Sequence, residues 1–323
     1  MKDIYILHEN AEWVVPLKAA FDNLGVEAKE WFLHEGQVAF DQVPPEGIFY
    51  NRMSASSHTR GHRYAPEFAR MALTWLEGHE SENRRVVNGT SALYLEVCKV
   101  SQYAALNKAG VKTPATRPVV GKEHLVKSAE QFNHWPLIVK PNRGGKGLGV
   151  QLLQSTQALA DFAADDSTDE PLDGIWLLQE YIQPTQKYIT RCEFVGGKFV
   201  YAVNVNTEDG FELCPADVCA IGDDFCPTTG STAGAGESTP PANKFNITHD
   251  YDDHPIIEKL QTCLADNGVE VAGIEIIQDA NGEVYAYDIN TNTNYNSQAE
   301  AEANVPLTGM GAVASFLVEL AKG

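Results

Sequence analysis

The hydrophobic and polar positions of this chain alternate between strand-like and helix-like patterns over its first hundred residues. Short apolar runs at Ile4–Leu7, Gly47–Tyr50 and Arg85–Asn88 indicate strands, and Val14–Leu24 between the first two indicates a helix. Strands that alternate with helices are typical of a parallel sheet with helices on its faces. Residues 1–100 are therefore expected to form a small α/β domain.

A strand, a glycine-rich loop and a second strand follow at residues 136–153. The glycine spacing fits neither the Walker loop nor the dinucleotide-binding loop, and both of those need a helix after the loop. We expect a hairpin loop whose backbone N–H groups bind phosphates, with Lys140 and Lys146 offsetting the phosphate charge. The alternative is a loop whose glycines merely turn the chain. The loop glycines are Gly144, Gly145, Gly147 and Gly149.

A third apolar run, Ile175–Ile182, ends in polar residues before Gln183-Pro184. An extended segment that leaves a sheet can offer backbone N–H and C=O groups to a purine, and Glu180 is then the candidate ligand of a ribose. Taken alone, the run is better explained as an ordinary buried strand with a polar end. Only the segments on either side favour the nucleotide interpretation.

Asn281-Gly282 lies between two strand-like runs and is a strong signal for a β-hairpin. If these two residues form the loop, Glu275 lies opposite Asp288, and Gly273, Ile277, Ala286 and Asn290 share their face. Two carboxylates at that spacing repel each other unless a cation lies between them. Together with Asn290 they make an all-oxygen ligand set that suits Mg²⁺. The alternative is a solvated hairpin, and a one-residue change in the loop would move the register.

These segments, in this order, resemble the ATP-grasp superfamily, and within it the RimK-like and glutathione-synthetase-like carboxylate–amine ligases. Further similarities are Asn88 followed by Lys99, the stretch Gly110–Thr116, and the strand that begins at Arg191. The resemblance covers most of the chain and implies an α/β class with the ATP-grasp fold. It implies an N-terminal α/β domain at 1–100, a nucleotide lid subdomain at 101–178, and a catalytic subdomain at 179–323. The catalytic subdomain contains a stretch rich in Gly, Ser, Thr and Pro at 221–243, which suits a lid, a binding loop or a disordered insertion.

The resemblance also implies roles for the candidate site residues. Arg191 and Lys140 would be catalytic, with Arg191 stabilising an acyl phosphate. Glu275, Asp288 and Asn290 would hold Mg²⁺, with Mn²⁺ as an alternative. The ATP-binding set would be Lys99, Lys140, Gly144, Gly145, Lys146, Gly147, Gln179, Glu180, Tyr181 and Ile182.

The chain departs from the family pattern in ways that concern the substrate more than the chemistry. RimK-like enzymes usually have an aspartate where this chain has Ile189. The usual order of metal carboxylates, Asp first and Glu second, is reversed here as Glu275 and Asp288, which keeps the charge constant. The stretch after the arginine strand, Val203–Cys214, also differs, so the acceptor preference of the family does not carry over.

Candidate substrate contacts come from two polar segments. Arg52 and a basic loop after it follow a strand end, where α/β sheets place ligands, and a guanidinium can bind a carboxylate through two hydrogen bonds. The alternative is a solvated loop whose arginines pair with surface acids. Asn294 and Asn296 lie in the polar segment after the metal strand and are further candidates.

Composition favours a soluble cytoplasmic enzyme. The 323 residues are 43% hydrophobic and carry a formal net charge of −20, which argues against nucleic-acid and anionic-membrane partners. No apolar run reaches the length of a membrane span, and the N-terminus runs directly into a strand pattern without the features of a signal peptide. The six cysteines lack paired short spacings. We expect free thiols, although Cys214, Cys219 and Cys226 share one glycine-rich stretch where a metal or redox role is the alternative.

The sequence thus predicts an ATP-dependent ligase that joins a carboxylate to an amine through an acyl phosphate and releases ADP and phosphate. The acid would be an amino acid, a small peptide or a protein terminus, and related enzymes are commonly homo-oligomers. One alternative is an ATP-grasp phosphotransferase that forms no amide. Another is a nucleotide-binding protein without turnover.

Overall fold

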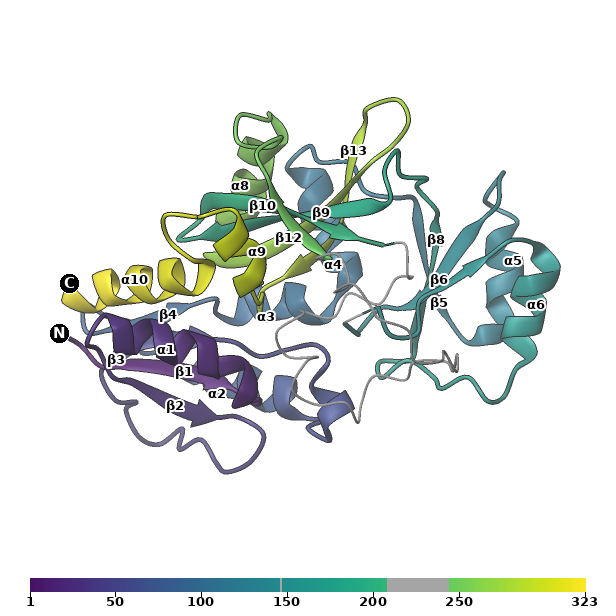
Figure 1. Ribbon diagram of the computed structural model, residues 1–323. Helices are drawn as coiled ribbons and strands as arrows, with labels where there is room; N and C mark the ends of the chain where they lie inside the picture. The colour runs from purple at the N-terminus through teal and green to yellow at the C-terminus, as the bar shows by residue number, and fades with distance from the viewer. Residues whose placement is uncertain (146, 208–243) are drawn as a thin grey trace, which may run out of the picture.

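The computed structural model describes residues 1–145, 147–207 and 244–323, and their strands form three sheets (Figure 1). The expected loop 221–243, Lys146, Cys214, Cys219 and Cys226 lie outside the described residues. The first sheet is parallel, in the order β2-β1-β3-β4. Its strands are β1 (Ile4–His8), β2 (Ala28–Phe32), β3 (Gly47–Asn51) and β4 (Arg84–Val87).

Helices cover both faces of this first sheet, as a buried parallel sheet requires. Helices α1 (Val15–Asn23) and α10 (Gly309–Lys322) pack on one face, where Leu17 and Leu317 share an apolar cluster with Ile6. Helix α2 (Ala65–Glu77) packs on the other face through Leu73. The C-terminal helix therefore lies beside the N-terminal strands (Figure 1), where Lys2 N donates to Ala321 O at 2.8 Å.

The second sheet is antiparallel, in the order β5-β8-β6-β7, and carries the glycine loop. Its strands are β5 (Thr116–Val120), β6 (Leu137–Pro141), β7 (Gln151–Leu153) and β8 (Ile175–Glu180). Helices α5 (Leu125–Ala129) and α6 (Thr156–Ala164) cover its outer face (Figure 1). Because side chains alternate along a strand, Leu137 and Val139 pack on these helices while Ile138 and Lys140 face the opposite way, into a cavity.

The third sheet, β11-β10-β9-β12-β13, is antiparallel and forms the opposite side of that cavity. Its strands are β9 (Tyr188–Val195), β10 (Lys198–Asn206), β11 (Phe245–Thr248), β12 (Val271–Gln278) and β13 (Val284–Asn290). Helices α4 (Lys99–Lys108) and α8 (Ile256–Asp266) cover the apolar face, where Leu106 and Leu260 meet Ile274. The other face of the third sheet is polar and lines the cavity.

The remaining described helices are short connectors. They are α3 (Thr90–Val97) and α9 (Ser297–Glu302), with 3-10 turns at Glu12–Val14, Ser57–Arg60 and Lys122–His124. Across the described ranges, none of the helices has the length and apolarity that a bilayer crossing demands.

Candidate active site

A cavity of about 220 Å³ lies between the second and third sheets and brings together residues that are far apart in the sequence. Segments from the first sheet close one side of it through Trp13, Ser54 and Ser56. The predicted site residues that line it are Lys99, Lys140, Gly144, Gly145, Gly147, Gln179, Glu180, Tyr181, Ile182, Arg191, Glu275, Asp288, Asn290 and Asn294.

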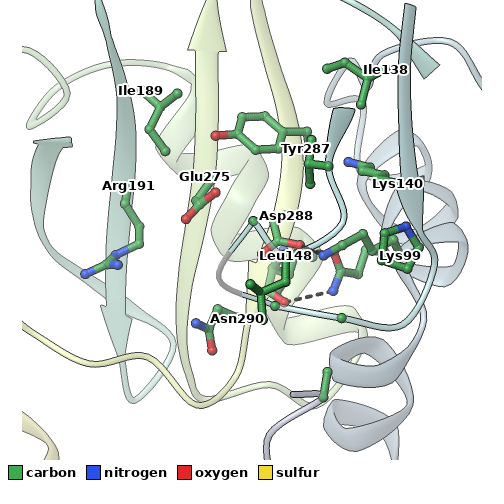
Figure 2. Close-up of a pocket in the computed structure, with 18 of the residues that line it drawn as sticks. Lys99, Ile138, Lys140, Leu148, Ile189, Arg191, Glu275, Tyr287, Asp288 and Asn290 are labelled. Atoms are coloured by element: carbon green, nitrogen blue, oxygen red, sulfur yellow. Dashed lines mark hydrogen bonds and ion pairs between the residues drawn. The ribbon is translucent and has the colours of Figure 1, made fainter. Parts of the chain in front are cut away.

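Charged side chains form a row across the floor of the cavity (Figure 2). Strand pairing places Arg191 of β9 beside Glu275 of β12, and Glu275 beside Asp288 of β13. Lys99, the first residue of α4, forms an ion pair with Asp288 at the end of the row. The order is therefore one cation, two adjacent anions and a second cation.

The predicted pairing of Glu275 with Asp288 is confirmed, but the predicted two-residue loop is wrong. Gln278 pairs with Val284, and Asp279 accepts hydrogen bonds from the backbone N–H groups of Asn281 and Glu283 at 2.8 and 2.9 Å. Gly282 then takes a positive φ of 81°, as a longer loop with a glycine at its end requires. This loop shifts the register by one residue, and a β-bulge after Glu275 shifts it back.

The bulge changes which side chains face the cavity. Ala286 pairs with Ile276 and lies in the apolar core, so its predicted position on the carboxylate face is wrong. Tyr287 is the extra residue of the bulge, and it lines the cavity together with its neighbour Asp288. A bulge commonly re-aims a side chain next to an active site in this way.

Lys140 lies in an aromatic setting at the edge of the cavity. Its ammonium group lies 5.6 Å from the ring centroid of Tyr103 and 5.8 Å from that of Tyr287. The side chain is buried, and aromatic faces attract a cation without neutralising it. Its charge therefore stays available for an anionic ligand.

The central carboxylates are strained by their own repulsion. Burial and the adjacent charge of Asp288 raise the pKa of Glu275 to about 7, although Arg191, Lys99 and a hydrogen bond from Tyr287 oppose the rise. At the end of the row, burial disfavours the charge of Lys99, but the carboxylate of Asp288 outweighs this and raises the pKa of Lys99. Burial and the charge of Asp288 thus outweigh the neighbouring cations in their effect on Glu275.

The donor set of this pair fits a hard divalent cation. Two carboxylates and the amide oxygen of Asn290, which lies two residues after Asp288, supply oxygen ligands of the kind that Mg²⁺ accepts while keeping waters for phosphate oxygens. A cation would also remove the repulsion that raises the pKa of Glu275. Within the described ranges there is no larger group of three or more His, Cys, Asp or Glu side chains placed to hold a metal.

Arg191 is held in place by hydrogen bonds, and its main partner, Glu193, was not identified from the sequence. Its Nε donates to Glu193, which lies two residues further on the same face of β9, and its Nη2 donates to Asn294 O at 2.7 Å. Burial raises the pKa of Glu193, while Arg191 and a hydrogen bond of 2.9 Å from Thr293 Oγ1 oppose the rise. An acid that alternates with an arginine in an apolar strand is the signal that could have identified this pair.

Gly273 makes room for this network. A Cβ at this position would lie 2.9 Å from both Glu193 Oε2 and Thr293 Oγ1. Because both atoms are buried, we expect Gly273→Ala to lower the free energy of unfolding by about 1–3 kcal/mol. Urea denaturation measures this change, and an unchanged midpoint would contradict the tight contact.

The edge strand β13 is held by side chains and loops rather than by another strand. Gln102 of α4 is buried, accepts from Ile289 N at 2.9 Å and donates to Ile289 O at 2.9 Å. Ala286 N donates to Lys112 O at 2.9 Å. Because Gln102 and Lys99 belong to the same helix, this contact also sets the position of Lys99 relative to Asp288.

The glycine loop rests on the first domain. A Cβ at Gly145 would lie 3.4 Å from Ser56 Cβ, and Arg143 forms an ion pair with Glu67 of α2. At the far side of the cavity, Gln179 donates to Thr116 Oγ1 at 2.7 Å, and Glu180 accepts from Ala115 N at 2.8 Å. The strand end of β8, which lines the cavity, is therefore held by hydrogen bonds to the segment before β5 and to β5 itself.

Two predicted substrate residues lie elsewhere. Arg52 is buried behind the cavity wall, where its Nη2 donates to Asn294 Oδ1 at 2.8 Å and to Thr293 O at 3.2 Å. Asn296 caps helix α9 by accepting from Ala299 N at 2.7 Å. Both side chains satisfy buried polar groups of the protein, and neither is among the residues that line the cavity.

Comparison with known families identifies the part of the chain that carries the glycine loop and Arg191. Residues 98–212 match the RimK-like ATP-grasp domain. This segment is similar to RimK-like ATP-grasp domains. The predicted family and the predicted α/β class are therefore confirmed.

Solved structures extend the ATP-grasp fold over the whole chain. A RimK domain ATP-grasp protein from Sphaerobacter thermophilus has 13% sequence identity and a TM-score of 0.63, with 97% of this chain and 98% of that chain covered. The ATP-grasp ligase PsnB, in complex with a minimal precursor, has 14% identity and a TM-score of 0.66 over 99% and 100% of the two chains. The D-Ala:D-Ser ligase VanG from Enterococcus faecalis has 14% identity and a TM-score of 0.65, with 99% of each chain covered. Comparison with curated proteins gives no match.

The ATP-grasp cavity also contains residues that sequence reasoning missed. Glu96 accepts from Ala55 N at 3.0 Å and from Thr291 N at 2.8 Å, which joins the first domain to the end of β13. Asn292 lines the cavity between Asn290 and Asn294. The repeated alternation of Asn and Thr over residues 290–294 is the signal that could have identified these contacts.

Proposed function

We propose that this chain is an ATP-dependent carboxylate–amine ligase, which forms an amide through an acyl phosphate and releases ADP and phosphate. The observation that carries the proposal is the row Arg191, Glu275, Asp288 and Lys99 on the floor of the ATP-grasp cavity, opposite Lys140 (Figure 2). Fixed charges of this kind stabilise charge that develops during phosphoryl transfer.

Each part of the row has a separate task in the proposed reaction. Glu275, Asp288 and Asn290 would hold Mg²⁺, which when bound offsets charge on the β- and γ-phosphates. Lys140 binds phosphate oxygens while its stem stays among aromatic rings. Arg191, held by Glu193, presents its guanidinium to the oxygens of the phosphoryl group as a substrate carboxylate attacks phosphorus.

Amide formation is favoured over the alternatives by the shape of the site. The glycine loop contacts Ser56, Arg143 forms an ion pair with Glu67, and the loop glycines line the cavity, so the loop forms part of the cavity wall. An acyl phosphate needs protection from hydrolysis, whereas a nucleotide-binding protein without turnover does not. Related solved structures include a D-cycloserine synthetase and a macrocyclase bound to a precursor peptide, which supports small molecules or peptides as substrates.

The proposal also specifies conditions and partners. We expect Mg²⁺ to be the working metal, with Mn²⁺ as a substitute, because the donor set is all oxygen. We expect a cytoplasmic homo-oligomer, because related enzymes are commonly oligomers. We expect no binding of nucleic acid, since the formal net charge is −20. Glutamate is one candidate substrate among the amino acids.

A matrix of substrates tests the ligase function. Phosphate release with Mg²⁺-ATP is measured across amino acids and dipeptides, singly and in pairs, with mass spectrometry of the products. A ligase gives phosphate release that depends on an amine, together with a product mass equal to the two substrates minus water. A phosphorylated acid or alcohol as the stable product would identify the phosphotransferase instead. ATP binding without turnover in every mixture would favour the non-catalytic protein.

Lys140→Met tests the proposed phosphate contact and still fills the space between the rings of Tyr103 and Tyr287. The thioether of methionine packs well against rings, so the fold is expected to keep its stability. Loss of the ammonium charge is expected to raise the KM for ATP by about tenfold or more. Steady-state kinetics at varied ATP measures the effect, and Lys127→Met on exposed α5 serves as the control. An equal KM in both variants would remove Lys140 from the ATP site.

A further inference from the structure

The segment that follows β13 has two chemically different sides. Asn290, Asn292 and Asn294 line the cavity, whereas Thr291 and Thr293 point their hydroxyls at buried carboxylates. Thr291 and Asn292 form a turn after β13, and the three asparagines of the Asn-Thr alternation become a row of amides in the cavity wall.

Buried charges fix this segment from behind. Thr291 Oγ1 donates to Glu96 Oε2 at 3.0 Å, and Thr293 Oγ1 donates to Glu193 Oε2 at 2.9 Å. Arg191 Nη2 donates to Asn294 O at 2.7 Å. The amide row is therefore held rigidly, as a pre-organised binding surface should be.

The three amides differ in whether their oxygens already accept a hydrogen bond from the protein. Asn290 Oδ1 accepts from Asn292 N at 2.9 Å, and Asn294 Oδ1 accepts from Arg52 Nη2 at 2.8 Å. Asn292 has a side chain that is only 4% exposed, and its Oδ1 has no hydrogen-bond partner within the part of the chain that the structure describes. A buried amide oxygen without a partner costs free energy, so its presence in a cavity wall points to a ligand that donates a hydrogen bond.

We propose that Asn292 Oδ1 accepts a hydrogen bond from the nitrogen of the amine substrate and so selects and orients the nucleophile. This inference rests on the proposed ligase function. In the step concerned, the nitrogen lone pair attacks the carbonyl carbon of the acyl phosphate and forms the C–N bond. The C–O bond to phosphate breaks, phosphate leaves with the electron pair, and the nitrogen loses a proton to the departing phosphate.

The chemistry of an amide suits this task better than that of a carboxylate. The attacking nitrogen must carry a free lone pair, so it must be unprotonated. A carboxylate would favour the charged ammonium form, whereas the neutral oxygen of Asn292 accepts an N–H without that bias. The carboxylate of Glu96 also lines the cavity, but it already accepts hydrogen bonds from Ala55 N and Thr291 N. Asn292 therefore favours an amine that enters uncharged.

Trapping with hydroxylamine separates the two half-reactions. Hydroxylamine reacts with an acyl phosphate directly, so hydroxamate formed with Mg²⁺-ATP and a panel of amino acids and dipeptides reports the first half-reaction. Amide formed with an amine from the same panel reports both. Asn292→Ala is expected to lower kcat/KM for the amine at least tenfold more than it lowers the rate of hydroxamate formation, and Asn292→Gln is expected to recover part of the loss.

A control variant and two contrary outcomes complete the test. Asn296→Ser keeps a helix cap on α9 and removes a nearby amide outside the cavity, so its ratio of amide to hydroxamate is expected to match the wild type. Equal falls of both rates in Asn292→Ala, or an altered Mg²⁺ requirement with an unchanged ratio, would overturn the role of Asn292 and leave the ligase intact. No hydroxamate from the wild type with any acid would instead overturn the ligase function itself.

Discussion

Glu275→Gln is expected to reduce turnover by at least about a hundredfold while it stabilises the metal-free protein. The substitution removes one of two adjacent carboxylates on the cavity floor, so a divalent cation loses a charged ligand and the phosphates lose that counter-charge. It also removes a buried charge, because burial and then the adjacent charge of Asp288 raise the pKa of Glu275 to about 7. At pH 8 the free energy of unfolding should therefore rise by about 1–3 kcal/mol.

The pH dependence of stability provides a sharper test of the same carboxylate. The pKa of Glu275 is higher in the folded protein than in the unfolded chain, so the folded state binds more protons between pH 4.5 and about 7. Stability of the metal-free wild type should fall as pH rises through this window, and the variant should lack that contribution. Denaturation with urea in EDTA at several pH values measures the difference.

Glu283→Gln is the matched control for this pair of measurements. Glu283 lies on the same hairpin, but its side chain is 49% exposed and pairs with Lys112. Both turnover and the pH dependence should remain close to wild type, because exposed pairs contribute little. A stability gain that is equal in the two variants, or full activity of Glu275→Gln, would contradict the assigned role of Glu275.

Glu193→Ala is expected to lower the free energy of unfolding by about 3–5 kcal/mol, because it leaves Arg191 buried without its partner. Thr293 also loses its acceptor, which loosens the segment that carries the cavity amides. Glu193→Gln keeps an acceptor for the Nε of Arg191 and should lose less stability. Guanidinium denaturation of the purified variants measures these changes.

The control for Glu193 is an ion pair on the surface. Lys29 and Asp3 have side chains that are 50% and 53% exposed, so Lys29→Ala should change the free energy of unfolding little. If Glu193→Ala lowers the free energy of unfolding no more than Lys29→Ala does, then the buried pair with Glu193 does not hold Arg191 in place.

The sequence predicted the fold and the floor of the site because both depend on local patterns. Lys140 was identified because it ends the strand before the glycine loop, Arg191 through the family resemblance, and both line the cavity. The hairpin signal predicted Glu275 opposite Asp288, but the bulge that restores this register could not be predicted in the same way. β12 also pairs with β9 on its other side, and a local loop signal contains no information about that third strand.

The supporting residues were harder to predict because their roles depend on long-range packing. Arg52 follows a strand end, which suggested a ligand contact, but Met310 of α10 and the 293–294 segment accept hydrogen bonds from its two terminal nitrogens. Asn296 was close to the site in sequence, yet it begins a helix. In both cases a polar residue near a site serves the protein's own backbone, and only the tertiary structure distinguishes that role from substrate binding.

The contacts along the free edge of β13 have a consequence for the behaviour of the protein in concentrated solution. An edge strand normally presents unpaired N–H and C=O groups that can add a strand from another molecule and seed aggregation. Here the amide of Gln102 and the carbonyl of Lys112 already occupy those groups at Ile289 and Ala286. The same contacts that align Lys99 with Asp288 therefore also protect the edge of the sheet beside the active site from intermolecular pairing.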